Sequence, residues 1–347
     1  MLVGQTSGLR RDDDHRTVVT LTITRLTTLV ALLVCSAPLG AEAQTPGKVW
    51  RIGMLETTSM ALNAPNLDAF RRGLRELGYV EGRNFMIEYR SADGRRERFP
   101  DLAAELVRLE VDLILTRGTP AVLAAKNATG TIPVVMAASG DPLLSGVVAG
   151  LARPGGNVTG LSAIIVEVTG KRLEMLREMV PRVSRIAVLF NMSNPNNALQ
   201  WREMEIAAPS LGVHPQLLDV RKPVDFGGAF DAAIRQRAGA LVVGIDALTQ
   251  ANHRFIVDLA AQHRLPAIYA TREFVDAGGL IAYGVSYPHL YHRAASFVDK
   301  IFKGAKPGEL PVEQPTKFEL VINAKTAKAL GITIPPSLLL RADQIIE

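Results

Sequence analysis

The sequence has little cysteine, little histidine and few aromatic residues. Its 347 residues include one cysteine, Cys35, and six histidines. These numbers exclude a disulfide framework within the chain and argue against a metal centre built on cysteine or histidine. Phe, Trp and Tyr make up only 5% of the residues, too few for the aromatic platforms on which single-stranded nucleic acids stack. We expect no metal, no cofactor and no nucleic-acid partner.

The chain also lacks long blocks of one charge sign. Its net charge is +5, and residues 1–43 carry as many basic as acidic groups. Elsewhere basic residues stand beside acidic ones, as in residues 71–76. This pattern favours a mixed solvated surface over a nucleic-acid-binding patch.

Familiar enzyme motifs are missing as well. The first apolar run is not followed by G-x-G-x-x-G, and neither a G-x-x-x-x-G-K-[ST] loop nor a G-x-S-x-G elbow occurs. The histidines have no identifiable nucleophile beside them. We therefore do not expect an enzyme.

The N-terminal segment resembles an export signal. Arg25 precedes an apolar stretch over residues 26–39, and Ala41-Glu42-Ala43 matches an A-x-A cleavage site. We predict a signal peptide over residues 1–43, a mature chain beginning near Gln44 and a periplasmic location. The alternative is a lipoprotein anchored at Cys35, but Val34 is bulky where a lipobox has a small residue.

From Val49 onward, short apolar runs alternate with longer amphipathic segments, which is the pattern of repeated βαβ units. Continuous β-rich runs are typical of parallel sheets covered on both faces. Ten strands fall into two series, separated near residues 160–168, and predict an α/β fold of two doubly wound parallel-sheet lobes joined by a multi-stranded hinge. The expected strands are 49–55, 85–89, 111–116, 132–138 and 158–162, then 185–190, 216–220, 240–245, 265–269 and 280–283.

The domain boundaries follow from this series. We expect an N-terminal lobe over 48–162, a C-terminal lobe over 163–283, a helix returning to the N-terminal lobe over 284–310, and a C-terminal segment over 311–347 packing on the C-terminal lobe.

Three predicted strands lead into the same kind of helix start. Thr119, Asp141 and Asn194 each precede a proline, so each is predicted to cap a helix that begins at the carboxyl end of a strand. Such helix ends present free N–H groups, which can hold a carboxylate or phosphate in the crevice at that edge of the sheet. Facing pairs of such ends predict a ligand cleft between the lobes. Taken singly, each one is also explained as a well-capped turn.

Other candidate ligand-binding residues lie at the same strand ends. Asp246 could accept from a ligand ammonium group or simply cap the following helix. Arg117 could pair with an acidic ligand group, although an arginine at a strand end is more often exposed. The remaining candidates are Glu56, Thr57, Thr58, Gly118, Ala138, Ser139, Asn191 and Tyr283.

Several long runs carry a resemblance to a known family. The sequence resembles the ABC transporter substrate-binding proteins of the tryptophan/tyrosine-binding (TrpX-like) type over almost the whole mature chain. The runs are Arg51–Leu55, Phe70–Tyr79, Gly118–Ala121, Gly140–Pro142, Leu151–Ser162, Pro311–Asn323 and Ile334–Asp343.

The resemblance implies a type I periplasmic-binding-protein fold and delivery of a captured solute to an inner-membrane ABC permease. It also implies that Thr119, Ala138 and Ser139 meet a ligand carboxylate and that Asp246 meets its ammonium. The loop Glu56-Thr57-Thr58 and Arg117 depart from the family pattern near this pocket, so the resemblance does not fix an aromatic amino acid as the ligand.

Capture of an amino acid or related small carboxylate by lobe closure, in a monomer, is therefore the expected function. The alternative is a sensory module of the same fold that presents its closed state to a receptor. A sugar-responsive repressor of related fold would need an N-terminal helix-turn-helix, where this chain has its predicted export signal.

Overall fold

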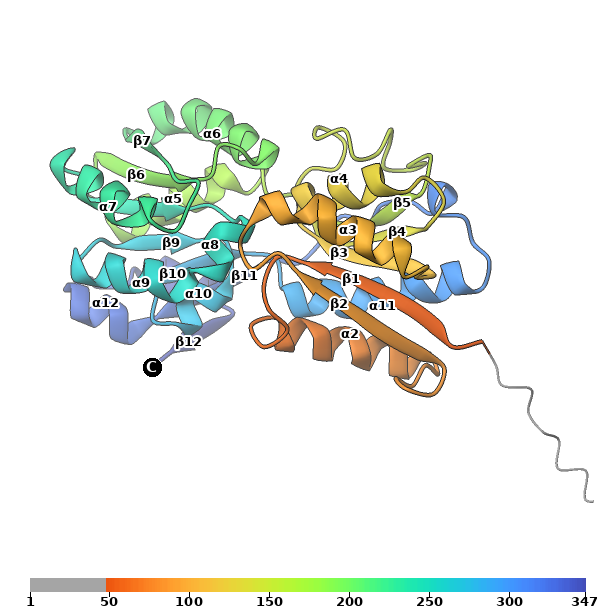
Figure 1. The fold of residues 1–347 in the computed structure, drawn as a ribbon. Coiled ribbons are helices and arrows are strands. Elements are labelled where there is room, and N and C mark those ends of the chain that lie inside the picture. The colour runs from red at the N-terminus through yellow and green to blue at the C-terminus, as the bar shows by residue number, and fades with distance from the viewer. Residues whose placement is uncertain (1–47) are drawn as a thin grey trace, which may run out of the picture. The chain divides into compact units, whose positions relative to one another are not determined.

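The computed structural model describes residues 48–347, which contain two β-sheets, one in each lobe (Figure 1). The predicted signal peptide and Cys35 lie outside the described residues. Two sheets, each covered by helices on both faces, confirm the predicted α/β fold with two parallel-sheet lobes. Among residues 48–347, no helix combines the length and the apolar character that a membrane span requires.

The first lobe is built on a five-stranded parallel sheet in the order β2-β1-β3-β4-β5. Its central strands are buried along their whole length, as expected for a parallel sheet with helices on both faces. The strands are β1 (Trp50–Glu56), β2 (Phe85–Ser91), β3 (Leu113–Arg117), β4 (Val134–Ser139) and β5 (Val158–Ser162).

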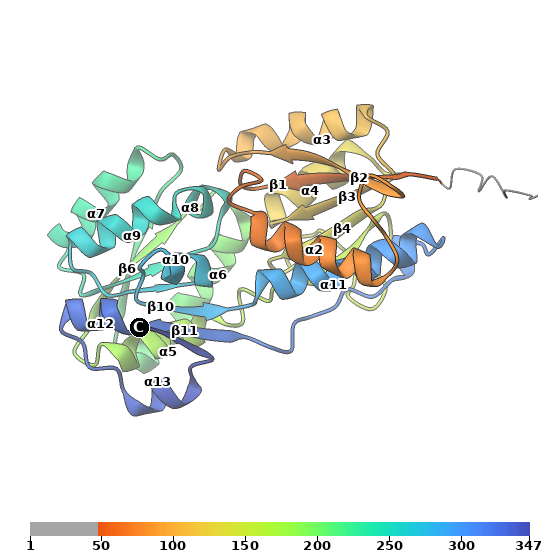
Figure 2. The ribbon, with the colours of Figure 1, turned by 90° about the horizontal axis from the view of Figure 1, so that it is seen from below.

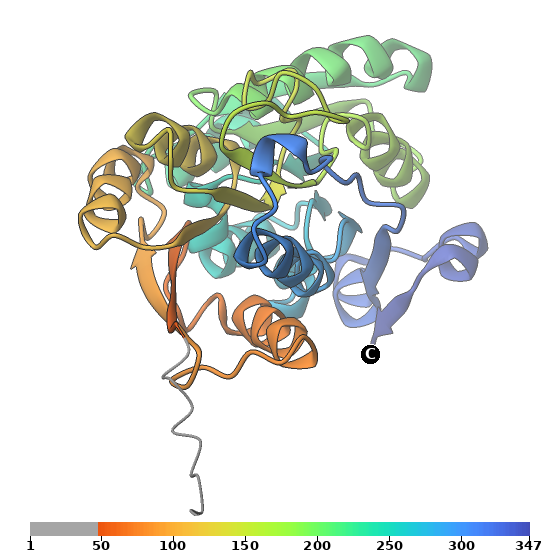
Figure 3. The same cartoon turned by 90° about the vertical axis from the view of Figure 1, so that its right-hand side faces the viewer.

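Two helix pairs enclose this sheet. Helices α2 and α11 bury one face, with Phe70 and Tyr291 in the same core as Met54, and α3 and α4 bury the other. Figures 2 and 3 show α11 beside α2, although the two are far apart in sequence. The helices are α2 (Ala64–Glu76), α3 (Phe99–Arg108), α4 (Thr119–Ala128) and α11 (Tyr287–Phe302), with short 3-10 turns η1 (Arg96–Arg98) and η3 (Pro307–Glu309).

The second lobe contains a seven-stranded sheet in the order β12-β11-β10-β9-β8-β6-β7. All neighbouring strands pair in parallel except β10 and β11, which pair antiparallel. The strands are β6 (Arg185–Phe190), β7 (His214–Asp219), β8 (Ala240–Val243), β9 (Ala267–Tyr269), β10 (Ile281–Gly284), β11 (Glu319–Asn323) and β12 (Gln344–Ile346).

Helices again cover both faces of this sheet. Phe226, Phe230 and Phe274 lie in the core on one side, and Leu176 and Met204 lie in the core on the other. The helices are α5 (Thr169–Met179), α6 (Pro195–Ala207), α7 (Asp225–Arg235), α8 (Ala247–Ala251), α9 (His253–Gln262), α10 (Arg272–Asp276), α12 (Ala324–Leu330) and α13 (Pro336–Arg341), with the 3-10 turn η2 (Ala208–Leu211).

The chain passes between the sheets after β5, after β10 and before β11. The last passage is fixed to the first lobe, because Ser162 donates its N–H to the carbonyl of Glu313 at 2.9 Å. The domain boundaries expected at residues 162, 283 and 310 stay a prediction.

The short helix α12 offers a test of local stability. Its N-cap is Asn323, whose Oδ1 accepts from the N–H of Thr326 at 3.0 Å. Asn323→Ala is expected to lower the free energy of unfolding by about 1 kcal/mol, since it removes this acceptor. Asn323→Asp keeps the acceptor and should stay near wild type in urea unfolding. Equal losses in the two variants would contradict the capping role.

Candidate functional site

A cavity lies between the carboxyl ends of the strands of the two lobes. It has about 440 Å³ of empty space, a volume that includes open solvent at its mouth. The first lobe lines it with the ends of β1, β3 and β4, and the second lobe with the starts of α6 and α8. Of the predicted site residues, those that line it are Thr57, Gly118, Thr119, Ala138, Ser139, Asn194 and Asp246.

The three predicted helix caps differ from one another. Asn194 is the N-cap of α6, and its side chain accepts from the N–H of Asn196, as predicted. The prediction for Thr119 is wrong, because Gly118, with a φ of 84°, is the N-cap and Thr119 is the first helical residue. Glycine suits this cap since the backbone there is left-handed.

The prediction for Asp141 is also wrong. Its Oδ1 accepts from the N–H groups of Leu143 at 2.9 Å and Leu144 at 2.7 Å, but residues 142–146 form turns instead of a helix. Gly146 has a φ of 71°, which the right-handed helix does not allow. Asp141 therefore caps a turn, and its side chain does not line the cavity.

Asn196 fills part of the crevice between the lobes. Its Nδ2 donates to the hydroxyl of Thr119, and its Oδ1 accepts from the N–H of Asp141 at 2.8 Å. The Thr119 hydroxyl also lies 3.2 Å from that of Ser139 and accepts from the N–H of Gly140 at 3.3 Å. The helix ends face each other across the cavity, as expected, but the hydroxyl predicted to meet a ligand carboxylate is already hydrogen-bonded by the protein.

Asp246 directly follows the apolar segment 240–245, which contains β8. Its carboxylate accepts from Asn191 Nδ2 at 2.9 Å, from Asn194 Nδ2 at 2.9 Å and from the N–H of Leu248 at 3.0 Å. It caps α8 in a capping box with Thr249. These three donors are neutral and bring no positive charge to the carboxylate of Asp246. Asn191 is buried behind it and does not line the cavity.

A buried ion pair lies on the first-lobe side. Glu56 is fully buried at the end of β1, and Arg117 is 3% exposed at the end of β3. Arg117 Nε lies 3.7 Å from Glu56 Oε2, and the Tyr291 hydroxyl donates to Glu56 Oε1 at 2.6 Å. The expectation that Arg117 is surface-exposed is wrong, because Arg117 lines the cavity, whereas Glu56 lies behind it.

Burial raises the pKa of the Glu56 carboxyl, and the positive charge of Arg117 and the hydrogen bond from Tyr291 offset this only in part. A carboxyl whose pKa is higher in the folded protein holds more protons there than in the unfolded chain. Its contribution to stability therefore falls as pH rises from 4.5, its ordinary value, to the raised value.

This gives a prediction for Glu56→Gln. We expect the free energy of unfolding of wild type, relative to this variant, to decrease as pH rises through that window. Urea unfolding of both proteins in matched buffers from about pH 4 to about pH 8 measures the difference. A relative stability of wild type that increases with pH would contradict the raised pKa.

The other two predicted residues lie elsewhere. Thr58 lines a small neighbouring pocket with Arg117 and Glu273, and its backbone carbonyl accepts from the Tyr89 hydroxyl at 2.8 Å. Tyr283 packs against Phe318 with ring centroids 5.8 Å apart, in the second lobe, and does not line the cavity.

Sequence reasoning missed several lining residues. Asn196 lies two residues after Asn194, and Gln250 lies four residues after Asp246. Their places in the first turns of α6 and α8 could have marked them as lining residues. Gln250 Oε1 accepts from the Thr57 hydroxyl at 3.2 Å, which joins the two lobes. Ile165 and Tyr287 come from the segments that connect the lobes and carry no motif that points to the cavity.

The comparisons with known proteins decide the family. Residues 54–346 match the sequence profile of the family described as ABC transporter substrate binding protein. The chain belongs to this family. Its members bind solutes and are not enzymes.

Two relatives of this substrate-binding protein carry a ligand in their names. A tyrosine-binding protein from Clostridioides difficile is 29% identical over 281 residues, which is 79% of this chain and 80% of the relative. The structure of an ABC domain from Streptococcus pneumoniae in complex with L-Trp is 28% identical and matches with a TM-score of 0.80, covering 86% of this chain and 100% of that one.

A third relative was solved without ligand. The open structure of a substrate binding protein with adhesive properties from Clostridium difficile is 25% identical, with a TM-score of 0.62 over 86% of this chain and 99% of that one. A leucine binding protein from Thermotoga maritima, at 16% identity and a TM-score of 0.52, shows the shared fold.

Proposed function

We propose that this substrate-binding protein captures an amino acid or a related small carboxylate outside the cytoplasm and delivers it to an inner-membrane ABC permease. The observation that carries the proposal is the cavity lined by strand ends of both lobes. A ligand that contacts both lobes stabilises only the arrangement in which they are close together, so binding and closure are coupled.

The charges of the cavity fit a zwitterion. Arg117 supplies a cation from the first lobe and Asp246 an anion from the second. Asp246 has one acceptor position left beyond its three neutral donors, since a carboxylate can accept about four hydrogen bonds. The apolar groups of Phe99, Ile165 and Ile245 leave a non-polar part of the cavity for a side chain.

The comparisons support closure on a small ligand. The structure of this chain is more similar to the L-Trp complex, with a TM-score of 0.80, than to the ligand-free, open structure, with a TM-score of 0.62. Sequence identity is similar in the two comparisons, and the coverage of this chain is equal. The direct bonds from Asn196 and Gln250 to first-lobe residues also belong to an arrangement with the lobes together. A dissociation constant of about 1 μM would correspond to about 8 kcal/mol, within reach of a few charge-assisted hydrogen bonds and one buried side chain.

Calorimetry with the mature chain tests capture. We expect at least one of the twenty common L-amino acids, with L-tyrosine and L-tryptophan in the panel, to bind with a dissociation constant of about 1 μM. No binding by any amino acid would overturn amino-acid capture.

Export and delivery need their own test. The mass of the protein recovered from the periplasm should correspond to a chain that begins near Gln44, and a strain without the gene should lose uptake of the bound solute. A full-length cytoplasmic protein would overturn the location, and unchanged uptake would overturn the transport role.

A further inference from the structure

Arg117 is a buried cation with unused hydrogen-bonding capacity at the cavity wall. Its Nη2 donates to the Thr57 hydroxyl at 2.8 Å, but its Nε has no hydrogen-bond acceptor among the described residues. Glu56 Oε2 is 3.7 Å away, outside hydrogen-bond distance, and no donor within residues 48–347 reaches it. Nε therefore faces the buried Glu56, but the Arg117 side chain also lines the cavity, so an acceptor on a ligand there would meet a guanidinium whose protein carboxylate is outside hydrogen-bond distance.

The protein also holds the guanidinium in place. Its Cζ lies 5.1 Å from the ring centroid of Tyr287 and 5.9 Å from that of Tyr291, so two aromatic faces flank it. With Thr57 fixing one nitrogen, the group is pre-organised, and a planar guanidinium suits a carboxylate better than a flexible ammonium does.

The neighbouring helix end offers less than the sequence suggests. At the start of α4, the N–H groups of Ala121 and Val122 already donate to the Gly118 carbonyl, and Pro120 has no N–H. The Thr119 hydroxyl is occupied by Asn196. Among the backbone N–H groups at the start of α4, that of Thr119 is therefore the one left for an anion.

We propose that Arg117, and not the α4 helix end, binds the carboxylate of the ligand, and that this carboxylate is the group the ligand must have. This inference rests on the proposed solute-binding function and deepens it. A ligand ammonium is less important, because Asp246 has three donors without it, whereas the Arg117 guanidinium has no carboxylate within hydrogen-bond distance when the ligand is missing. The raised pKa of Glu56 agrees with a guanidinium that is incompletely neutralised by its protein partner.

The ligand-side experiment uses matched compounds in calorimetry. The probes are L-tyrosine, L-tryptophan, L-leucine and L-glutamate, their α-carboxamides, and their analogues without the amino group. For each acid that binds, we expect the amide to bind at least about 10- to 100-fold more weakly, as lost charge-assisted bonds predict. The analogue that keeps the carboxylate should lose less than the amide.

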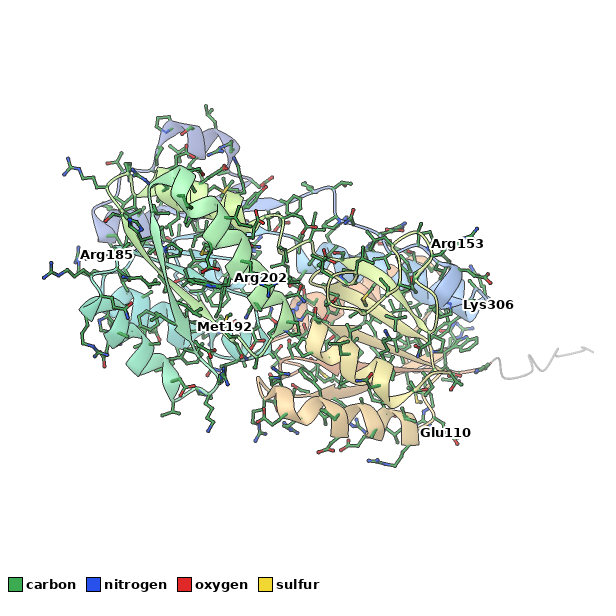
Figure 4. All side chains as sticks on the ribbon, turned by 90° about the horizontal axis from the view of Figure 1, so that it is seen from above. Glu110, Arg153, Arg185, Met192, Arg202 and Lys306 are labelled. Carbon is green, nitrogen blue, oxygen red and sulfur yellow. The ribbon has the colours of Figure 1, made fainter. Side chains whose placement is uncertain are left out.

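The protein-side experiment separates binding from folding. Arg117→Gln should weaken binding of the best acid about 10- to 100-fold. Glu56→Gln/Arg117→Gln removes both charges of the pair, so that no buried carboxylate is left alone, and it should show the same loss while remaining folded by circular dichroism. The matched control is Arg202→Gln, the same substitution at an exposed position on α6 (Figure 4), which should bind like wild type.

The outcomes are distinguishable. Amino acids that bind equally well as amides, or to the folded double variant, would overturn the role of Arg117 and leave solute capture intact. Binding of the analogues without an amino group, with no amino acid bound, would support Arg117 and restrict the ligand class to the related carboxylates. Absence of binding by every carboxylate would overturn both.

Discussion

Arg117→Gln, with Glu56 retained, is expected to lower the free energy of unfolding by about 3–5 kcal/mol at neutral pH. The substitution leaves a fully buried carboxylate without its cation, and removing one partner of a buried pair typically has this cost. Chemical unfolding of wild type and variant at neutral pH measures the difference.

The control is the double variant Glu56→Gln/Arg117→Gln. It should recover most of the lost stability, because both charges are removed and Tyr291 can still donate to the amide oxygen. The loss in the single variant should also shrink below about pH 4.5, where the Glu56 carboxyl is protonated in the folded and the unfolded chain alike. A single variant as stable as wild type at neutral pH would show that the pair contributes nothing to the fold.

Gly140→Leu is expected to weaken ligand binding by about 10- to 100-fold with little change in stability. A Cβ at Gly140 would overlap the carboxamide of Asn196 from the opposite lobe. Overpacking of this kind costs about 1–3 kcal/mol, and here the lobes can avoid the cost by staying apart. The open population then grows at the expense of the binding-competent one, and the apparent affinity falls accordingly.

Calorimetry and small-angle X-ray scattering together test this expectation. The variant should have a larger radius of gyration than wild type and should require more ligand to reduce it. The matched control is Gly130→Leu, because Gly130 is exposed and a Cβ there meets no atom within 4 Å. Equal affinities for the two variants would contradict the contact between Gly140 and Asn196 as a part of closure.

The architecture could be predicted from the sequence because the order of strands and helices follows from local hydrophobic patterns. Alternating apolar runs and amphipathic segments located the ten strands of the two series, and the strands lie within a few residues of their expected positions. The strand β12 was missed, since only two apolar residues, Ile345 and Ile346, mark it in the sequence. The helix expected after Pro142 does not form, because residues 142–146 are turns and Gly146 has a left-handed φ of 71°.

The site was predictable only in part. Strand ends identified seven lining residues, because the carboxyl ends of parallel strands meet at one edge of a sheet. The burial of Arg117 was not predictable, since it depends on Glu56, Tyr287 and Tyr291, which come from distant segments of the chain. The occupation of the Thr119 hydroxyl by Asn196 likewise depends on how the two lobes meet.

The first lobe cannot complete its core until helix α11 has been synthesised. Tyr291 and Phe297 complete the core that Phe70 and Met54 begin, yet they leave the ribosome only after the whole second sheet up to β10 has been made. At ordinary translation rates the growing N-terminal half waits about ten seconds for this helix, with one face of its sheet uncovered. A fragment that ends at residue 162 should therefore aggregate, whereas the nascent chain stays unfinished long enough for chaperones to bind it.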